Sequence, residues 1–195
     1  IKDLRKKAEI GDAESQFFLA VSYHMEEGAT KNISEAIKWY LQAAEQNHLK
    51  AQFNLAMMYF VGQDIPQNFK ETAKWLKRSA EKGEAASQNA LAVLYFNGQG
   101  VEKNLEEAIK WWRRSGENGN SCAQVSLGAM YYDGIGVEKD IVKALMWQNI
   151  SIENGNNDGH QNKDILEKEA TLEQIAEAKM LADLWMKGRK VEGEK

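Results

Sequence analysis

The sequence predicts an all-α protein: a right-handed αα-superhelix, or solenoid, of about four and a half helix-turn-helix repeats with a C-terminal capping helix. Tryptophan recurs every 36 residues in four successive units, and leucine, tyrosine and glutamine columns keep the same step. The chain of 195 residues contains one proline, which fits helices throughout because proline breaks helix interiors. The repeated positions are Trp39, Trp75, Trp111 and Trp147; Leu19, Leu55, Leu91 and Leu127; Tyr23, Tyr59, Tyr95 and Tyr131; and Gln16, Gln52, Gln88 and Gln124.

The third repeat shows how each element is specified. Apolar residues at helical spacing predict a first helix over Glu84–Phe96, and the glycines of Asn97–Gly100 end it, since glycine readily adopts positive φ. Asn104 is a favourable N-cap for a second helix over Leu105–Glu117. Glu107, three residues after Asn104, predicts a reciprocal capping box.

The whole stretch 1–187 is predicted to be one domain. A partial fifth unit leads to a helix that begins with a capping box, Thr171 and Gln174, and seals the last open core face. The predicted boundaries are repeats 8–43, 44–79, 80–115 and 116–151, a partial repeat 152–168, a capping helix 171–187 and a tail 188–195.

The repeat resembles the Sel1-like repeat, a relative of the tetratricopeptide repeat, through its Gln, Leu-Gly/Ala, Tyr, Gly-x-Gly-Val, Lys/Glu-Ala and Trp positions. The best match in this sequence is Gly83, Gln88, Leu91, Ala92, Tyr95, Gly98–Val101, Glu107, Ala108 and Trp111. A tetratricopeptide unit has 34 residues and lacks the Gly-x-Gly-Val loop. The resemblance implies signalling adaptors, bacterial host-interaction proteins or partners of secreted toxins.

Composition narrows the kinds of partner. The net charge is −4 with both signs mixed, which argues against nucleic acid, where clustered cations are needed. No apolar run is long enough to span a membrane. Cys122 is the only cysteine, so an intramolecular disulfide is excluded. The chain starts at Ile1 without Met, and the compartment stays open between bacterial periplasm or secretion and cytoplasm.

No catalytic, cofactor or metal site is expected. His24, His48 and His160 fall at unrelated places, whereas a metal needs converging ligands. The glycine loops at 98–100 and 134–136 follow helices rather than strands, so the context for phosphate binding is missing. The sequence therefore predicts that the protein is not an enzyme.

A partner is expected on the concave face, which the resemblance places on the first helix of each unit. Positions opposite the core stripe follow from 100° per residue. Most of them are apolar, and an exposed apolar stripe often marks a binding site. The aromatic column at 24, 60, 96 and 132 also fits packing between helices. The predicted partner-binding residues are Phe17, Val21, His24, Phe53, Met57, Phe60, Asn89, Val93, Phe96, Val125 and Tyr132, with Ala129 beside them.

These observations favour a non-catalytic protein-interaction module, an adaptor or scaffold that binds a partner segment on its concave face. The alternative is an inhibitory or immunity-type protein that binds and blocks a folded partner enzyme. An uncharacterised hydrolase would need a pocket with converging titratable groups. We expect a monomer, and end-to-end self-association remains open because the region before Ala8 is a weak cap.

Overall fold

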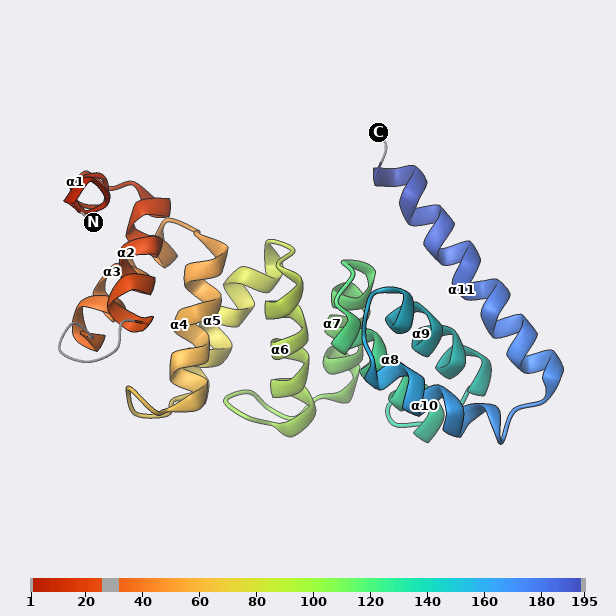
Figure 1. Ribbon diagram of the computed structural model, residues 1–195. Coiled ribbons are helices and arrows are strands. Elements are labelled where there is room, and N and C mark those ends of the chain that lie inside the picture. Colours follow the sequence, from red (N-terminus) through yellow and green to blue (C-terminus); the bar gives the residue numbers. More distant parts are fainter. Residues whose placement is uncertain (1, 26–31, 194–195) are drawn as a thin grey trace. The chain divides into compact units, whose positions relative to one another are not determined.

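The computed structural model describes residues 2–25 and 32–193 (Figure 1), and all regular structure within these ranges is α-helical. The chain divides into two compact units, 1–103 and 104–195. The first unit holds α1 (Lys2–Glu9), α2 (Ala13–Met25), α3 (Ile33–Glu45), α4 (Leu49–Val61), α5 (Phe69–Glu81) and α6 (Ala85–Asn97). The second holds α7 (Leu105–Glu117), α8 (Ser121–Asp133), α9 (Ile141–Glu153), α10 (Asp158–Glu167) and α11 (Leu172–Gly193).

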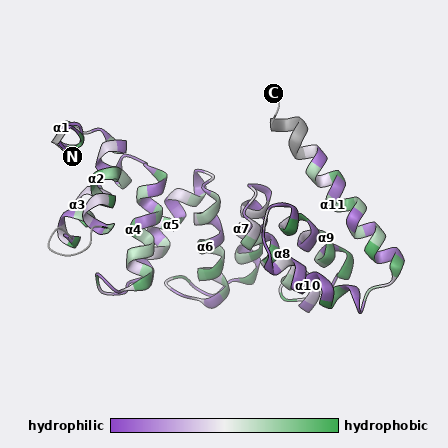
Figure 2. Ribbon diagram, in the orientation of Figure 1, coloured by the Kyte–Doolittle hydropathy of each residue, from purple (hydrophilic) through white to green (hydrophobic). Residues whose placement is uncertain are grey.

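Each unit is built from antiparallel neighbours in sequence. In the first unit, two helix pairs form, α2 with α3 and α4 with α5, and contacts between α3 and α4 join them. At the two ends of this unit, α1 packs on α2 and α6 packs on α5. In the second unit, α7 packs on α8 and α8 pairs with α9. Both α10 and α11 also pack on α9. The helices bear hydrophobic and hydrophilic residues side by side (Figure 2), as expected for helices with one buried face. The predicted all-α class and its repeated helix-turn-helix units are confirmed.

The predicted helix bounds in the third repeat agree closely with the structure. The second helix spans Leu105–Glu117 as predicted, and the first starts one residue later than predicted, at Ala85. Glu84 is the N-cap, and its carboxylate accepts from the backbone N–H groups of Ala86 and Ser87. Gly98 ends this helix with a φ of 73°, the positive region that glycine adopts at low cost.

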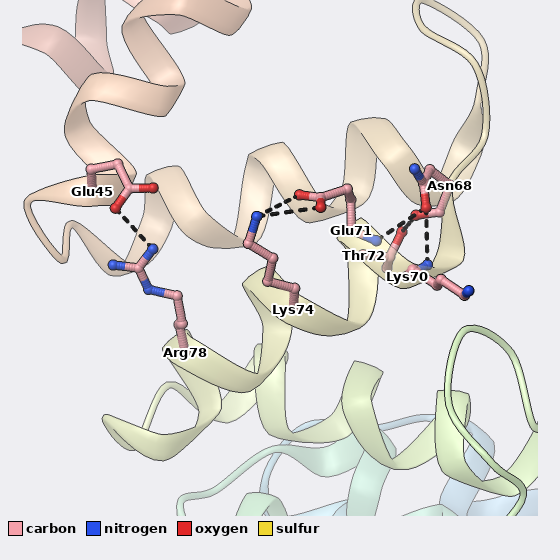
Figure 3. Close-up of polar contacts among 7 residues, drawn as sticks. All are labelled: Glu45, Asn68, Lys70, Glu71, Thr72, Lys74 and Arg78. Atoms are coloured by element: carbon pink, nitrogen blue, oxygen red, sulfur yellow. Dashed lines mark hydrogen bonds and ion pairs between the residues drawn. The ribbon is translucent and has the colours of Figure 1, made fainter.

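The asparagine N-caps form, but at Asn68 another contact takes the place of the reciprocal arm of a capping box. Asn68 Oδ1 accepts from the backbone N–H of Lys70 and of Glu71, 3.1 Å each (Figure 3), whereas the Glu71 carboxylate pairs with Lys74. The backbone N–H of Asn68 instead donates to the carbonyl of Tyr59, 2.9 Å away. The glutamate is left to pair with lysine because the preceding helix already supplies the acceptor. The full capping box occurs at Thr171 and Gln174, as predicted, with bonds of 2.9 and 3.2 Å.

The glutamine column links each first helix to the end of the helix before it. Every one of these buried glutamines donates its side-chain N–H to the carbonyl eight residues earlier: Gln16 to Ala8, Gln52 to Ala44, Gln88 to Ala80 and Gln124 to Gly116, at 2.8–3.0 Å. The same carbonyls accept the backbone N–H of a residue with positive φ: Gly11, Asn47, Gly83 and Gly119. Carbonyls at helix ends lack partners within the helix, so these bonds satisfy them inside the core.

The C-terminal helices depart from this pattern. His160, the next position of the glutamine column, is exposed on α10. The residues assigned to a capping helix lie in α11, which packs on α9 and brings Trp185 into an edge-on contact with Trp147, with ring centres 5.7 Å apart. Ala178 and Ala182 on α11 are small and buried, and they allow α11 to approach α9 closely.

Within the glutamine column, Gln52 has a side-chain oxygen without a hydrogen-bond donor, and this leads to a prediction about stability. Gln16 Oε1 accepts from Gln46, and Gln124 Oε1 accepts from Asn154, both 30 residues later, but Gln52 Oε1 is buried without a donor. The equivalent position is Lys82, whose side chain is exposed. Lys82→Asn should therefore raise the free energy of unfolding by about 1 kcal/mol, measured by urea unfolding. Lys82→Ala, which offers no donor, is the control; an equal gain in both variants would contradict the explanation.

A second prediction concerns the start of α9, where the N-cap is Asp140. Burial raises the pKa of its carboxyl, but the backbone and side-chain hydrogen bonds and the charge of Lys143 outweigh this and hold the pKa below its ordinary value. A lowered native pKa contributes stability above the unfolded pKa that is lost as the pH falls through the native pKa. Asp140→Asn keeps a capping oxygen without titrating.

Urea unfolding at several pH values between about 5 and 2 should show that the native chain loses up to about 1 kcal/mol relative to Asp140→Asn, allowing for solvent screening. Parallel curves for the two proteins would show that this cap makes no acid-dependent contribution.

Candidate partner-binding surface

The predicted binding residues lie on the first helices of the repeats, and the structure gives them unequal exposure. Phe17 is buried, with 8% of its surface exposed, because its ring stacks on His48 with centres 4.6 Å apart. His48 also caps α4 by accepting the backbone N–H of Ala51. Phe17 is thus part of the packing between α2 and α4. The other ten residues of the predicted set are half-buried: Val21, His24, Phe53, Met57, Phe60, Asn89, Val93, Phe96, Val125 and Tyr132.

Three of the predicted residues meet at one groove in the first unit. We call it the α2–α4 groove; its volume is about 340 Å³, and it is lined by His24, Met25, Phe53, Asn54, Met57, Met58, Val61, Gln63 and Asp64. Two of its apolar side chains are largely exposed, Met25 at 68% and Val61 at 57%. The walls come from α2, α4 and the loop that follows α4.

Several polar groups of the α2–α4 groove have defined partners, whereas His24 Nδ1 is buried without one. His24 Nε2 lies 3.3 Å from Asp64 Oδ2, and the histidine ring meets Tyr40 edge-on with centres 6.0 Å apart. Asn54 donates to Tyr40 Oη at 3.3 Å. Burial raises the pKa of Tyr40, and the Asn54 bond only partly offsets this, so the phenol stays neutral.

The sequence prediction missed Asp64, although the sequence carries a signal for it. The loop after α4 reads Gly62-Gln63-Asp64-Ile65-Pro66, where the third unit has Gly98-Gln99-Gly100-Val101. Asp64 therefore replaces the second glycine of the repeat's loop. The carboxylate that approaches His24 arises from this departure.

The side chains at 60, 96 and 132, which belong to the aromatic column, each contact another part of the chain. Phe60 meets Phe69 edge-on at 5.8 Å, Lys103 lies 5.8 Å from the ring of Phe96, and Tyr132 donates to Glu169 at 2.6 Å. The Glu169 hydrogen bond, with smaller contributions from burial and nearby negative charge, raises the pKa of Tyr132. These contacts favour a packing role for the column.

A smaller pocket of about 110 Å³ lies in the second unit. It is lined by Gly128, Ala129, Tyr132, Gln148, Asn162, Ile165 and Leu166, from α8, α9 and α10. Four of these side chains stand 108 residues, or three repeats, after residues of the α2–α4 groove: Tyr132 after His24, Asn162 after Asn54, Ile165 after Met57 and Leu166 after Met58. We call it the α8–α10 pocket. The two hollows therefore occupy the same place in the repeat.

Within the described residues, no group of three or more His, Cys, Asp or Glu side chains is arranged to hold a metal ion. None of the described helices is both long enough and apolar enough to cross a membrane.

Comparison with known proteins identifies the repeat. A model of the Sel1 repeat matches residues 13–48, 49–84, 85–120 and 123–156. The first three segments begin five residues after the predicted starts at 8, 44 and 80, so each contains one complete helix pair. No curated protein matches the sequence.

Solved structures with the same fold include a protective antigen present in uropathogenic Escherichia coli strains, which has 38% sequence identity and a TM-score of 0.86. The match covers 94% of this chain and 40% of that one, so this chain spans less than half of the length of the E. coli protein. A Sel1 repeat protein from Oxalobacter formigenes has 29% identity and a TM-score of 0.78, over 96% of this chain and 78% of that one. An immunity protein from Pseudomonas aeruginosa, with 19% identity and a TM-score of 0.52 over 94% and 70% of the chains, shares the fold.

The contrast between Phe17 and its neighbour gives a third prediction. Phe17→Ala should lower the free energy of unfolding by about 3 kcal/mol, because it removes a buried ring that contacts His48 and Tyr40. Phe18→Ala should cost less than about 1 kcal/mol, since Phe18 is 49% exposed. Chemical unfolding of both variants checks this, and similar losses would contradict the packing assigned to Phe17.

Proposed function

This chain belongs to the Sel1 repeat family, and we propose that it is a non-catalytic interaction module that holds a segment of a partner protein in the α2–α4 groove. Sel1 repeat proteins generally mediate protein–protein interaction. The observation that carries the proposal is the exposure of Met25 and Val61 at the rim of an apolar groove of about 340 Å³. A groove of this size accommodates one or two side chains of a peptide.

The side chains of the groove suit an extended or helical segment with an apolar anchor. Met25, Met57 and Met58 are flexible and polarizable, so they can adjust to an incoming side chain. Phe53 adds a rigid apolar wall. Met58 is already buried, so desolvation of Met25, Phe53 and Met57 would supply most of the affinity, as in other grooves that bind peptides through a few anchors.

The polar groups of the groove add direction to the binding. Asn54 provides an acceptor oxygen beside the apolar wall, and a backbone or side-chain N–H of the partner can meet it. Such polar contacts fix the orientation of a bound segment more than they raise its affinity.

The alternative is an immunity-type protein that blocks a partner enzyme. The P. aeruginosa immunity protein shows that a protein of this fold can have an immunity role. Its sequence identity of 19% is too low to assign its partner to this chain. The two proposals differ in the target: a peptide segment for the groove, a folded surface for the inhibitor.

A displayed library of random peptides tests the groove directly. The native chain should enrich peptides that share an aliphatic or aromatic anchor, and Met57→Glu should weaken their binding at least about tenfold, because it places a charge on the apolar wall. Met180→Glu is the matched control, since Met180 is a methionine on α11 that is 55% exposed and far along the chain from the groove. Circular dichroism verifies that both variants fold.

Enriched peptides that bind the Met57→Glu variant as well as the native chain would show that the groove is not the binding site. Failure to enrich any peptide, together with a stoichiometric complex with a folded enzyme, would favour the immunity-type alternative.

A further inference from the structure

Gln148 stands where the other repeats place a large apolar or aromatic side chain. The equivalent residues, 36 apart, are Tyr40, Leu76 and Trp112. All four are almost fully buried, with 0%, 1%, 4% and 1% of Tyr40, Leu76, Trp112 and Gln148 exposed. The repeat therefore needs an apolar filler at this position, and the fourth unit carries a polar one.

The side-chain oxygen of Gln148 is unpaired. Gln148 Nε2 donates to the carbonyl of Val125 at 3.4 Å, which sets the orientation of the amide and leaves Oε1 buried without a hydrogen-bond donor. A buried acceptor without a donor destabilises the folded protein, because water solvates it in the unfolded chain.

Gly128 makes room for this glutamine. The other repeats have Ala20, Ala56 and Ala92 at the same position, and a Cβ at Gly128 would collide with the Gln148 amide. Gly128 lies within α8, where glycine is less favourable than alanine. The fourth unit thus carries a buried polar side chain together with the glycine that makes room for it, and both residues line the α8–α10 pocket.

We propose that the α8–α10 pocket binds a mid-sized side chain of a partner protein that carries a neutral O–H or N–H donor, and that this donor pairs with Gln148 Oε1. A cavity of about 150 Å³ holds benzene, so the pocket of about 110 Å³ suits a group of four or five heavy atoms. Ala129, Ile165 and Leu166 contact its apolar part. Oε1 is covered in this structure, so the occupant reaches it after a local movement of the side chains that line the pocket.

Both signs of charge lie near the pocket, and it is the cost of desolvation that favours a neutral donor over a cation. Tyr132 at the pocket already donates to Glu169, and the ammonium of Lys139 lies 4.9 Å from the Tyr132 ring. A cation would lose its hydration against the apolar wall at a large cost, whereas a neutral donor loses much less.

The assignment of the occupant to a protein rests on the proposed function, because the pocket is the repeat equivalent of the α2–α4 groove. The chemistry of the pocket is tested without any peptide. Butan-2-ol and butan-2-one have the same number of heavy atoms, and only the alcohol has a donor. Each is titrated into the ¹⁵N-labelled full chain while the side-chain amide signals of Gln148 and Asn162 are followed by NMR.

We expect the alcohol to shift both amide signals saturably and the ketone to bind at least about tenfold more weakly, as expected when a buried acceptor stays unpaired. Equal shifts with the two compounds would overturn the role of the donor. No shift with either would show that the pocket takes water alone, and would overturn the site.

The double variant Gly128→Ala, Gln148→Leu introduces the pair that the second repeat carries as Ala56 and Leu76. It should raise the midpoint of thermal unfolding by about 2–4 °C or more and abolish the response to butan-2-ol. A lower midpoint would show that Gln148 is a satisfied structural residue and would overturn the proposal. The double variant should still bind the peptides selected for the α2–α4 groove. Failure of the α8–α10 pocket proposal can therefore be distinguished from failure of the proposed function.

Discussion

The hydrogen bond from each buried glutamine to the carbonyl eight residues earlier is the interaction on which the repeat depends. It joins the start of one helix pair to the end of the preceding helix, and its acceptor also receives the N–H of a residue with positive φ. Both bonds satisfy a helix end that is buried and closed to water. Because the two donors converge on one oxygen, the turn between helices has a fixed length and direction. Within each compact unit, the α2–α4 groove and the α8–α10 pocket are lined by first helices of successive repeats.

Much of the architecture follows from the period of the sequence, because helix propensity, caps and apolar spacing all agree. Leu105–Glu117 was predictable to the residue since an asparagine cap precedes it and glycine-containing turns flank it. The asparagine caps were predictable, but at Asn68 the reciprocal arm of a capping box is replaced for a tertiary reason: its backbone N–H donates to the carbonyl of Tyr59, and a local motif cannot reveal this. Likewise the glutamine column was visible, but its acceptors lie on the backbone and leave no mark in the sequence.

The candidate site was less predictable because exposure depends on side chains from the next repeat. The angular argument placed Phe17 and Phe53 on the same face, yet His48 from the following loop covers Phe17 and leaves Phe53 half-buried in the groove. Asp64 was missed because it lies in the loop after α4, whereas the angular argument selects residues on the helix itself. In a repeat protein such departures are informative, since the remaining units show which residue the fold itself requires at that position.

Two departures from the repeat pattern each leave a buried glutamine oxygen without a hydrogen-bond donor, at Gln52 and at Gln148. The surroundings of the two oxygens differ, and so does the interpretation of each. Gln52 Oε1 lacks a donor because Lys82 replaces the amide found at the equivalent Gln46 and Asn154, and Gln52 is not among the residues that line the α2–α4 groove. One substitution outside the core would correct it, so it is a local loss of stability. Gln148 Oε1 lies beside a pocket, in a position that the fold elsewhere fills with apolar groups, and it requires a second change at Gly128. A buried acceptor without a donor, at a position that folding elsewhere fills with apolar groups, is the kind of local inconsistency expected at a functional site.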